Sequence, residues 1–272
     1  MLKVTIGQHY PANSFIHRMD PRMKLLCTLL FIVFIFFITN FIGYAVAALY
    51  LITVIKVSTV PPRFLLRGLR AILFIIVFTA ALNIFFTAGE TTLWQWGSIR
   101  ISQEGLLNAG RMALRLTMLI IGSSILTLTT TPIQLTDAIE YGLKPLKKIK
   151  VPAHEIAMMM TIALRFIPTL IEEMDKIMKA QMARGADFDT GGIIKKAKSL
   201  VPLLVPLFIS AFRRAEDLAL AMESRCYRGD VGRTRMKKMR MAGRDYVAFS
   251  LILLFIASIF VINHFAYLHG IW

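Results

Sequence analysis

Residues 152–185 read PAHEIAMMMTIALRFIPTLIEEMDKIMKAQMARG, and this stretch predicts one long helix with a single apolar face. Its apolar side chains recur at the helical intervals of three and four residues: Ile156, Met160, Ala163, Ile167, Leu170, Met174 and Ile177. We expect the helix to begin at Pro152 and to end at Gly185, because glycine readily adopts the left-handed conformation that closes a helix. The charges beyond Ile171 argue against a membrane span, so the apolar face should contact a partner or the membrane surface.

A second long helix is expected from about Ile193 to Tyr227. Its apolar core, residues 200–212, is shorter than the roughly 20 residues that cross a bilayer. Pro202 and Pro206 each lack the N–H of a helical hydrogen bond, so we expect a bend there. The bend is either a fixed angle or a hinge, and the apolar residues around the two prolines favour a fixed angle.

Outside these two helices lie apolar runs long enough to cross a membrane. Of the 272 residues, 56% are hydrophobic, which is more than in an ordinary soluble domain. Five spans are predicted, at residues 23–39, 41–60, 71–88, 106–131 and 246–265. The fold class is therefore an all-α membrane protein with about five transmembrane helices and a cytoplasmic domain of long amphipathic helices. The predicted domains are a four-helix membrane part (residues 1–131), the cytoplasmic helices (residues 132–243) and a last transmembrane helix (residues 244–272).

The net charge of +16 comes from basic residues that alternate with the apolar runs. Six of them lie at or just outside the ends of the first three spans on one side: Arg18, Arg22, Lys24, Arg63, Arg67 and Arg70. An excess of lysine and arginine marks the cytoplasmic side. We therefore expect a multi-pass protein of the cell membrane, with its N-terminus inside and its C-terminus outside. The same alternation favours attraction to membrane lipids and argues against a nucleic-acid partner.

Sequence patterns that carry catalysis are absent. The sequence has no Gly-x-x-x-x-Gly-Lys-Ser/Thr loop for a nucleotide and no His-Glu-x-x-His motif for zinc, and its five histidines are scattered. Carboxylates are almost absent from the predicted spans, whereas ion-driven carriers keep some there. We therefore expect no catalytic, cofactor or metal site in this chain.

Two arginines near the ends of the long cytoplasmic helices are the candidate functional residues. Arg184 precedes a helix-ending glycine, and Arg225 lies near the close of the second helix. A cation at a helix C-terminus also interacts favourably with the helix dipole. The alternative to a functional role is therefore that both arginines are ordinary capping charges that stabilise their own helices. Near the outer end of the fourth span, Arg111 and Arg115 are interpreted either as contacts to lipid headgroups or as contacts to another membrane subunit.

Four stretches of the chain resemble, in the same order, the transmembrane coupling component of energy-coupling factor transporters, also called the T component or EcfT family. They are residues 17–25 (HRMDPRMKL), 131–146, 163–168 (ALRFIP) and 181–186 (QMARGA). The similarity covers nearly the whole chain. It implies a scaffold of an ATP-driven importer for a vitamin or a metal ion, in which two ABC-type ATPase subunits are coupled to a substrate-binding membrane subunit, the S component.

The resemblance also implies roles for particular residues. The family has two Ala-Arg-Gly motifs that insert into grooves of the ATPases, and they correspond here to Ala183-Arg184-Gly185 and Ser224-Arg225-Cys226. Because Cys226 lacks the backbone freedom of glycine, we expect the second helix to continue to Tyr227 or Gly229. ATP and Mg²⁺ would be bound by the ATPase subunits, and this chain would bind no cofactor and catalyse no reaction.

The apolar face of the first long helix is the expected contact for the substrate-binding subunit. Its central residues for this contact are Met160, Ile167 and Met174. Methionine repacks easily against different partners, although packing within the chain would also explain these residues.

Two other classes of membrane protein remain compatible with the composition. In a membrane-protein insertase, Arg111, Arg115 or Arg165 would line a hydrophilic groove. A self-contained channel or carrier would transport when reconstituted alone. Co-purification separates the three classes, because a scaffold brings ATPases with it and an insertase brings ribosomes or nascent chains.

Overall fold

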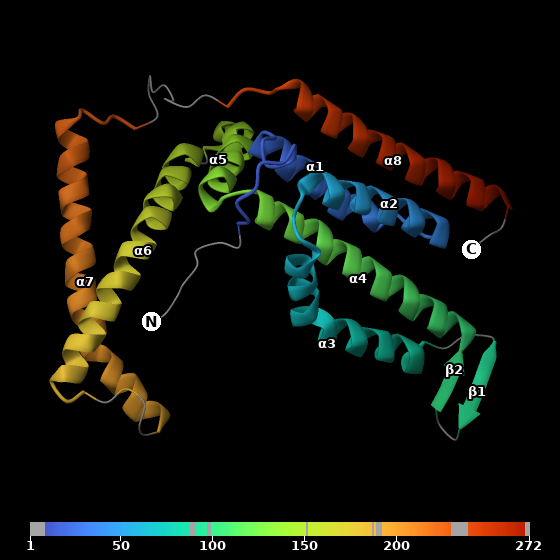
Figure 1. The fold of residues 1–272 in the computed structure, drawn as a ribbon, viewed down its shortest axis with the longest axis horizontal. Helices are drawn as coiled ribbons and strands as arrows, with labels where there is room; N and C mark the ends of the chain where they lie inside the picture. The colour runs from blue at the N-terminus through green and yellow to red at the C-terminus, as the bar shows by residue number, and fades with distance from the viewer. Residues whose placement is uncertain are drawn as a thin grey trace. The chain divides into compact units, whose positions relative to one another are not determined.

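A computed structural model of the chain describes residues 9–87, 91–96, 99–150, 152–186, 188, 192–229 and 239–269. Its elements, in chain order, are α1 (Pro21–Ile35), α2 (Phe41–Ser58), α3 (Pro62–Phe86), β1 (Thr92–Trp96), β2 (Ile99–Ser102), α4 (Gln103–Thr129), α5 (Pro132–Leu143), the 3-10 helix η1 (Lys144–Ile149), α6 (Ala153–Ala183), α7 (Ile193–Ser224) and α8 (Gly243–His269) (Figure 1). The two strands form one short antiparallel hairpin between α3 and α4. The predicted all-α membrane fold is confirmed, and the hairpin is an addition that the sequence did not suggest.

The chain forms two compact units, which are described separately below. Of the described residues, 9–138 and 239–269 belong to the membrane unit, and 139–229 belong to the α6–α7 unit. The predicted first and last domains thus contribute to the same unit, because α8 packs against α1 and α2.

The core of the membrane unit lies among α1, α2, α4 and α8. Aromatic rings from three of these helices meet there: the ring of Tyr50 lies 4.9 Å from that of Phe255 and 5.7 Å from that of Phe31, between ring centroids. Helix α4 approaches the ring of Phe31 closely at Gly122, where an added Cβ would lie 2.7 Å from that ring. Small residues permit such close approach in membrane proteins, where packing rather than water exclusion holds helices together.

The helices that could cross a membrane differ from the predicted spans. In the described part of the chain, α2, α4, α6 and α8 are long and apolar enough, and α3 adds a fifth if its two halves form one bent span. Helix α6, predicted not to span, is the least apolar of the four, with a mean hydropathy of 1.3. Helix α1 has 15 residues and rises about 22 Å, less than the roughly 30 Å of a hydrocarbon core.

The predicted first span, residues 23–39, is wrong at its end, because α1 stops at Ile35. Polar side chains of other helices satisfy the backbone that follows it. Arg115 of α4 donates from Nη2 to the carbonyl of Ile38 (3.2 Å), and Asn263 of α8 donates from Nδ2 to the carbonyl of Phe37 (2.7 Å). Irregular backbone at membrane depth is tolerated only with such partners. Arg115 therefore serves the end of α1, a role that differs from both interpretations made from the sequence.

The start of α3 also differs from the prediction. Helix α3 begins at Pro62, nine residues before the predicted span 71–88, so Arg63, Arg67 and Arg70 lie within its first turns rather than in a loop. Proline suits this position because the first helical N–H has no acceptor within the helix. The helix bends by 56° between its segments 62–70 and 72–86.

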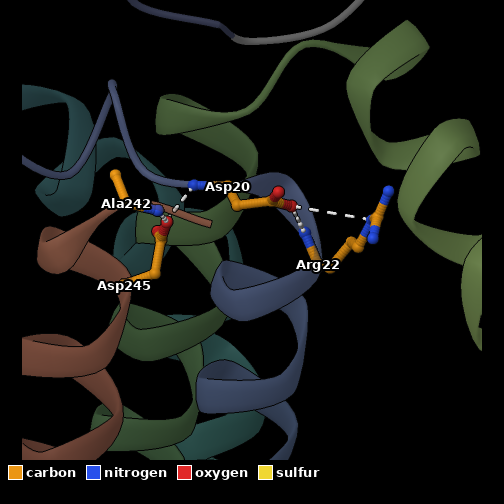
Figure 2. Close-up of polar contacts among 4 residues, drawn as sticks. All are labelled: Asp20, Arg22, Ala242 and Asp245. Carbon is orange, nitrogen blue, oxygen red and sulfur yellow. Dashed lines mark hydrogen bonds and ion pairs between the residues drawn. The ribbon is translucent and has the colours of Figure 1, made fainter. Parts of the chain in front are cut away.

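One carboxylate joins the starts of α1 and α8 (Figure 2). Asp245, only 2% exposed, accepts hydrogen bonds from the backbone N–H of Asp20 and of Ala242, both at 2.8 Å. Asp20 in turn caps α1 by accepting from the N–H of Arg22 at 3.0 Å. Nearby in the chain, the buried Lys24 donates from Nζ to the carbonyl of Thr129, where α4 ends (2.9 Å). Buried charges are thus used to satisfy helix ends.

Replacing Arg115 by methionine should destabilise the membrane unit, because it removes bonds to the Ile38 carbonyl and to the Tyr44 hydroxyl. The expected loss is about 2 kcal/mol or more, since bonds to charged groups contribute about 1.5–3 kcal/mol each. Thermal unfolding of the purified chain in detergent measures it. The matched control is Arg111→Met, which removes a cation–π contact with Phe41 worth about 0.5–1 kcal/mol. Equal shifts for the two variants would contradict the capping role.

Candidate functional site

The ends of α6 and α7 have the same backbone geometry. Arg184 is the C-cap residue of α6 (φ −88°, ψ 8°), and Arg225 is the C-cap residue of α7 (φ −92°, ψ 13°). The next residue is left-handed in both cases, Gly185 with φ +86° and Cys226 with φ +55°. Each arginine therefore occupies the same position relative to its helix.

Both ends are closed by the paired backbone hydrogen bonds of a Schellman motif. The bonds run from Ala186 N to Gln181 O (3.0 Å), Gly185 N to Met182 O (3.0 Å), Tyr227 N to Met222 O (3.1 Å) and Cys226 N to Glu223 O (2.8 Å). The expectation that α7 continues to Tyr227 or Gly229 is therefore wrong, since α7 ends at Ser224. Cys226 takes the position of glycine, and the two hydrogen bonds offset the roughly 1–2 kcal/mol that a left-handed residue with a Cβ costs.

The residues of both motifs are accessible. Ala183, Arg184 and Gly185 are exposed, as are Ser224, Arg225 and Cys226. The backbone bonds already satisfy two of the last carbonyls of each helix, so the guanidinium groups are not required to cap them. An exposed guanidinium at a helix end can form a bidentate contact with a carboxylate.

A polar contact joins the middle of α6 to α7. The carboxylate of Glu173 accepts hydrogen bonds from the Ser210 hydroxyl and from Arg214 Nη2, the latter at 2.9 Å. Sequence reasoning missed this contact, because it pairs residues about 40 positions apart and the sequence carries no signal of their proximity.

A second contact between the two helices involves the prolines. Pro202 and Pro206 both lie inside α7, and Pro206 has no N–H to donate to the carbonyl of Pro202. Gln181 of α6 donates to that carbonyl instead, from Nε2 at 3.5 Å. This long contact between exposed groups places Gln181 of α6 beside the prolines of α7.

These contacts show that α6 and α7 run antiparallel, because Glu173 pairs near Arg214 while Gln181 pairs near Pro202. Arg184 therefore lies near the Pro202 region, whereas Arg225 lies at the far end of α7. A straight helix from Pro202 to Arg225 rises about 35 Å. Figure 1 shows the C-terminal ends of α6 and α7 at opposite ends of the crossed pair, so one groove cannot hold both arginines.

The predicted apolar face of α6 remains partly open. Met160 is 37% exposed and Ile167 is 38% exposed, while Met174 is half-buried. Helix α7 adds an exposed apolar surface within the predicted apolar core 200–212, formed by Val201, Leu204, Val205, Phe208, Ile209 and Phe212. Among the residues that the structure describes, no group of three or more histidine, cysteine, aspartate or glutamate side chains could hold a metal ion.

Known proteins are similar over almost the full length of the chain. Residues 12–237 match the CbiQ family, described as cobalt transport protein. The chain is 58% identical over 249 residues to the energy-coupling factor transporter transmembrane protein EcfT of Thermosediminibacter oceani, which is 92% of this chain and 94% of that protein. The protein of the same name from Ruminiclostridium cellulolyticum is 53% identical over 261 residues, 96% of this chain and 97% of the relative. That from Clostridium kluyveri is 56% identical over 246 residues, covering 90% and 91%.

The chain belongs to the EcfT family. It is therefore a membrane component of an energy-coupling factor transporter, as the resemblance of its four sequence stretches predicted.

Replacing Cys226 by glycine should stabilise the last turn of α7, because glycine adopts a left-handed φ without the steric cost of a Cβ. The gain is expected to be about 1 kcal/mol. Hydrogen–deuterium exchange of the amides at residues 222–227 measures it locally. Ser224→Gly is the matched control: Ser224 is helical, so glycine there should increase exchange by weakening the helix. Changes in the same direction for both variants would show that Cys226 is not strained.

Proposed function

We propose that this chain is the scaffold that couples two ABC-type ATPase subunits to a substrate-binding membrane subunit in an importer of a vitamin or a metal ion. The observation that carries the proposal is the pair of arginine-bearing helix ends, Arg184 and Arg225, which have the same backbone geometry. The two helix ends have the same geometry and lie far apart on the antiparallel pair α6 and α7. They therefore match two separate partner sites of the same kind. A pair of ATPase subunits provides such sites.

On this proposal the two arginines bind acidic residues in grooves of the ATPases. A sheltered bidentate contact with a carboxylate contributes about 1.5–3 kcal/mol. Ala183 and Ser224 would end the helices against the groove, and Gly185 and Cys226 would turn the chain away from it. ATP and Mg²⁺ would be bound by the ATPases, so this chain would be a non-catalytic subunit without a cofactor of its own.

The α6–α7 unit would transmit the motion of the ATPases to the substrate-binding subunit. Its contact for that subunit would be the apolar face of α6 around Met160, Ile167 and Met174, whose methionines can repack against different partners. Leu203, between the two prolines, is 6% exposed, and its packing supports a fixed angle at Pro202 and Pro206 rather than a hinge. The surplus of basic residues supports an N-terminus and an α6–α7 unit in the cytoplasm, with the C-terminus outside.

Replacing Arg184 or Arg225 by alanine should weaken ATPase binding about ten- to hundredfold, the loss of one charged hydrogen-bonded contact. The double variant should lose more than either single variant, because simultaneous engagement of two sites strengthens both. Lysine should rescue only in part, since it cannot form the planar bidentate contact. The measurements are recovery of ATPase subunits with the purified complex and uptake by reconstituted vesicles.

The controls for these arginine variants are Lys179→Ala and Arg228→Ala, which remove exposed cations close to the same helix ends. Both controls should retain the ATPases. Normal ATPase recovery and normal uptake in the Arg184→Ala, Arg225→Ala double variant would refute the coupling role of the two arginines.

An aspartate at Met160, Ile167 or Met174 should release the substrate-binding subunit and leave the ATPases bound, because an unpaired charge in an apolar contact costs several kcal/mol. Recovery of each subunit with the affinity-purified chain measures this outcome. Thr169→Asp is the control, since Thr169 is exposed and lies on the side of α6 opposite Met160. Retention of the substrate-binding subunit by all three variants would contradict the assigned face.

A further inference from the structure

Three arginines form one exposed face on the first turns of α3. Arg63, Arg67 and Arg70 are exposed, and their spacing of four and three residues places them within an arc of about 60° at roughly 100° per residue. Leu65, 4% exposed, lies on the opposite side of the helix and packs into the core of the membrane unit. The arginine face is therefore held away from the core.

Within α3, Arg67 lies over the ring of Phe64, 5.6 Å from the ring centroid, but none of the three arginines can pair with a carboxylate of the same helix. The helix PRFLLRGLRAILFIIVFTAALNIFF contains no carboxylate, and its first turn has no acidic residue. The N-terminal end of a helix carries a partial positive charge, which is unfavourable for Arg63 in the first turn; the effect falls off before Arg67 and Arg70. Three exposed arginines on one face mark the cytoplasmic side, and they also offer a site for an anion outside the helix.

The same side of α3 becomes apolar beyond the bend. Phe74 is 78% exposed, Val77 is 60% exposed and Phe78 is 53% exposed. The rings of Phe74 and Phe78 stack, with centroids 6.1 Å apart. From Arg67 to Phe78 the bent helix extends about 15 Å from end to end, close to half of the roughly 30 Å hydrocarbon core of a bilayer. The exposed side thus changes from cationic to apolar over the length of one lipid leaflet.

We propose that this side of α3 binds an anionic phospholipid, with the phosphate on Arg63, Arg67 and Arg70 and an acyl chain along Phe74, Val77 and Phe78. An acidic protein would match the arginines and leave the exposed aromatic rings uncovered, whereas a phospholipid matches both parts. The 56° bend separates the segment at headgroup level from the segment in the acyl-chain layer. This site is independent of the helix ends at Arg184 and Arg225.

The test uses the full-length chain in phosphatidylcholine vesicles with spin-labelled phosphatidylglycerol or spin-labelled phosphatidylcholine as the probe. Electron spin resonance gives the fraction of each probe that is immobilised by the protein. The unmodified chain should prefer phosphatidylglycerol. In the triple variant Arg63→Gln, Arg67→Gln, Arg70→Gln this preference should fall at least about fivefold, because a single basic residue near an anionic surface already contributes about that much. The triple lysine variant should keep most of it. Phe74→Ala with Phe78→Ala should lower immobilisation of both probes.

The matched control removes three exposed cations from the α6–α7 unit: Lys179→Gln, Lys198→Gln and Arg213→Gln. This control should keep the phosphatidylglycerol preference. An unchanged preference in the triple glutamine variant, or an equal loss in the control, would overturn the proposal. Displacement of the lipid probe by inorganic phosphate at equal concentration would assign the arginines to a free anion instead. If the glutamine variant does not fold, the unmodified chain still decides: its preference must fall as salt screens the arginines, and a salt-independent preference would refute the site.

Discussion

The ends of helices in a membrane protein must find hydrogen-bond partners within the protein, and this requirement organises the membrane unit. Hydrocarbon offers no partner for a backbone N–H or carbonyl. The starts of α1 and α8 share the carboxylate of Asp245, and the backbone beyond α1 depends on Arg115 and Asn263. Each of these polar side chains comes from a distant part of the sequence. They therefore fix how the helices lie against one another, while the aromatic core around Tyr50 and Phe255 fills the space between them.

The same requirement is met differently at the ends of α6 and α7. There the backbone closes on itself through the Schellman bonds, so neither helix needs a side chain from elsewhere to end. Arg184 and Arg225 are consequently presented on ends that are stable without a partner. A partner that binds them meets a preformed site and loses less free energy to ordering. This preformed geometry favours a recognition role over the alternative of ordinary capping charges.

The sequence predicted the number and order of the long helices because apolar runs and helical periodicity are local signals. It failed where an end depends on a residue far away in the chain: nothing near Ile35 indicates that Arg115 and Asn263 will satisfy the backbone after it. The prediction of where α7 ends failed for another reason. Cys226 adopts a left-handed backbone conformation, which residue propensities assign to glycine. The start of α3 was available from the sequence, because Pro62 is a favourable first helical residue. Arg184, Gly185 and Arg225 were predicted from their positions at helix ends, and the family resemblance added the role proposed for them. The contact of Glu173 with Arg214 was found only in the structure.

The two contacts between α6 and α7 have a consequence for how the unit would transmit motion. A single contact would let the helices swivel about it, so that a displacement of one end need not reach the other. Glu173 and Gln181 lie eight residues apart on α6, a rise of about 12 Å, and each is bonded to α7. Two separated contacts resist swivelling, and the second closes a gap that Pro206 would otherwise leave in the hydrogen bonds of α7. A pair joined in this way would move as one lever, and a displacement at Arg184 would then be felt at Arg225.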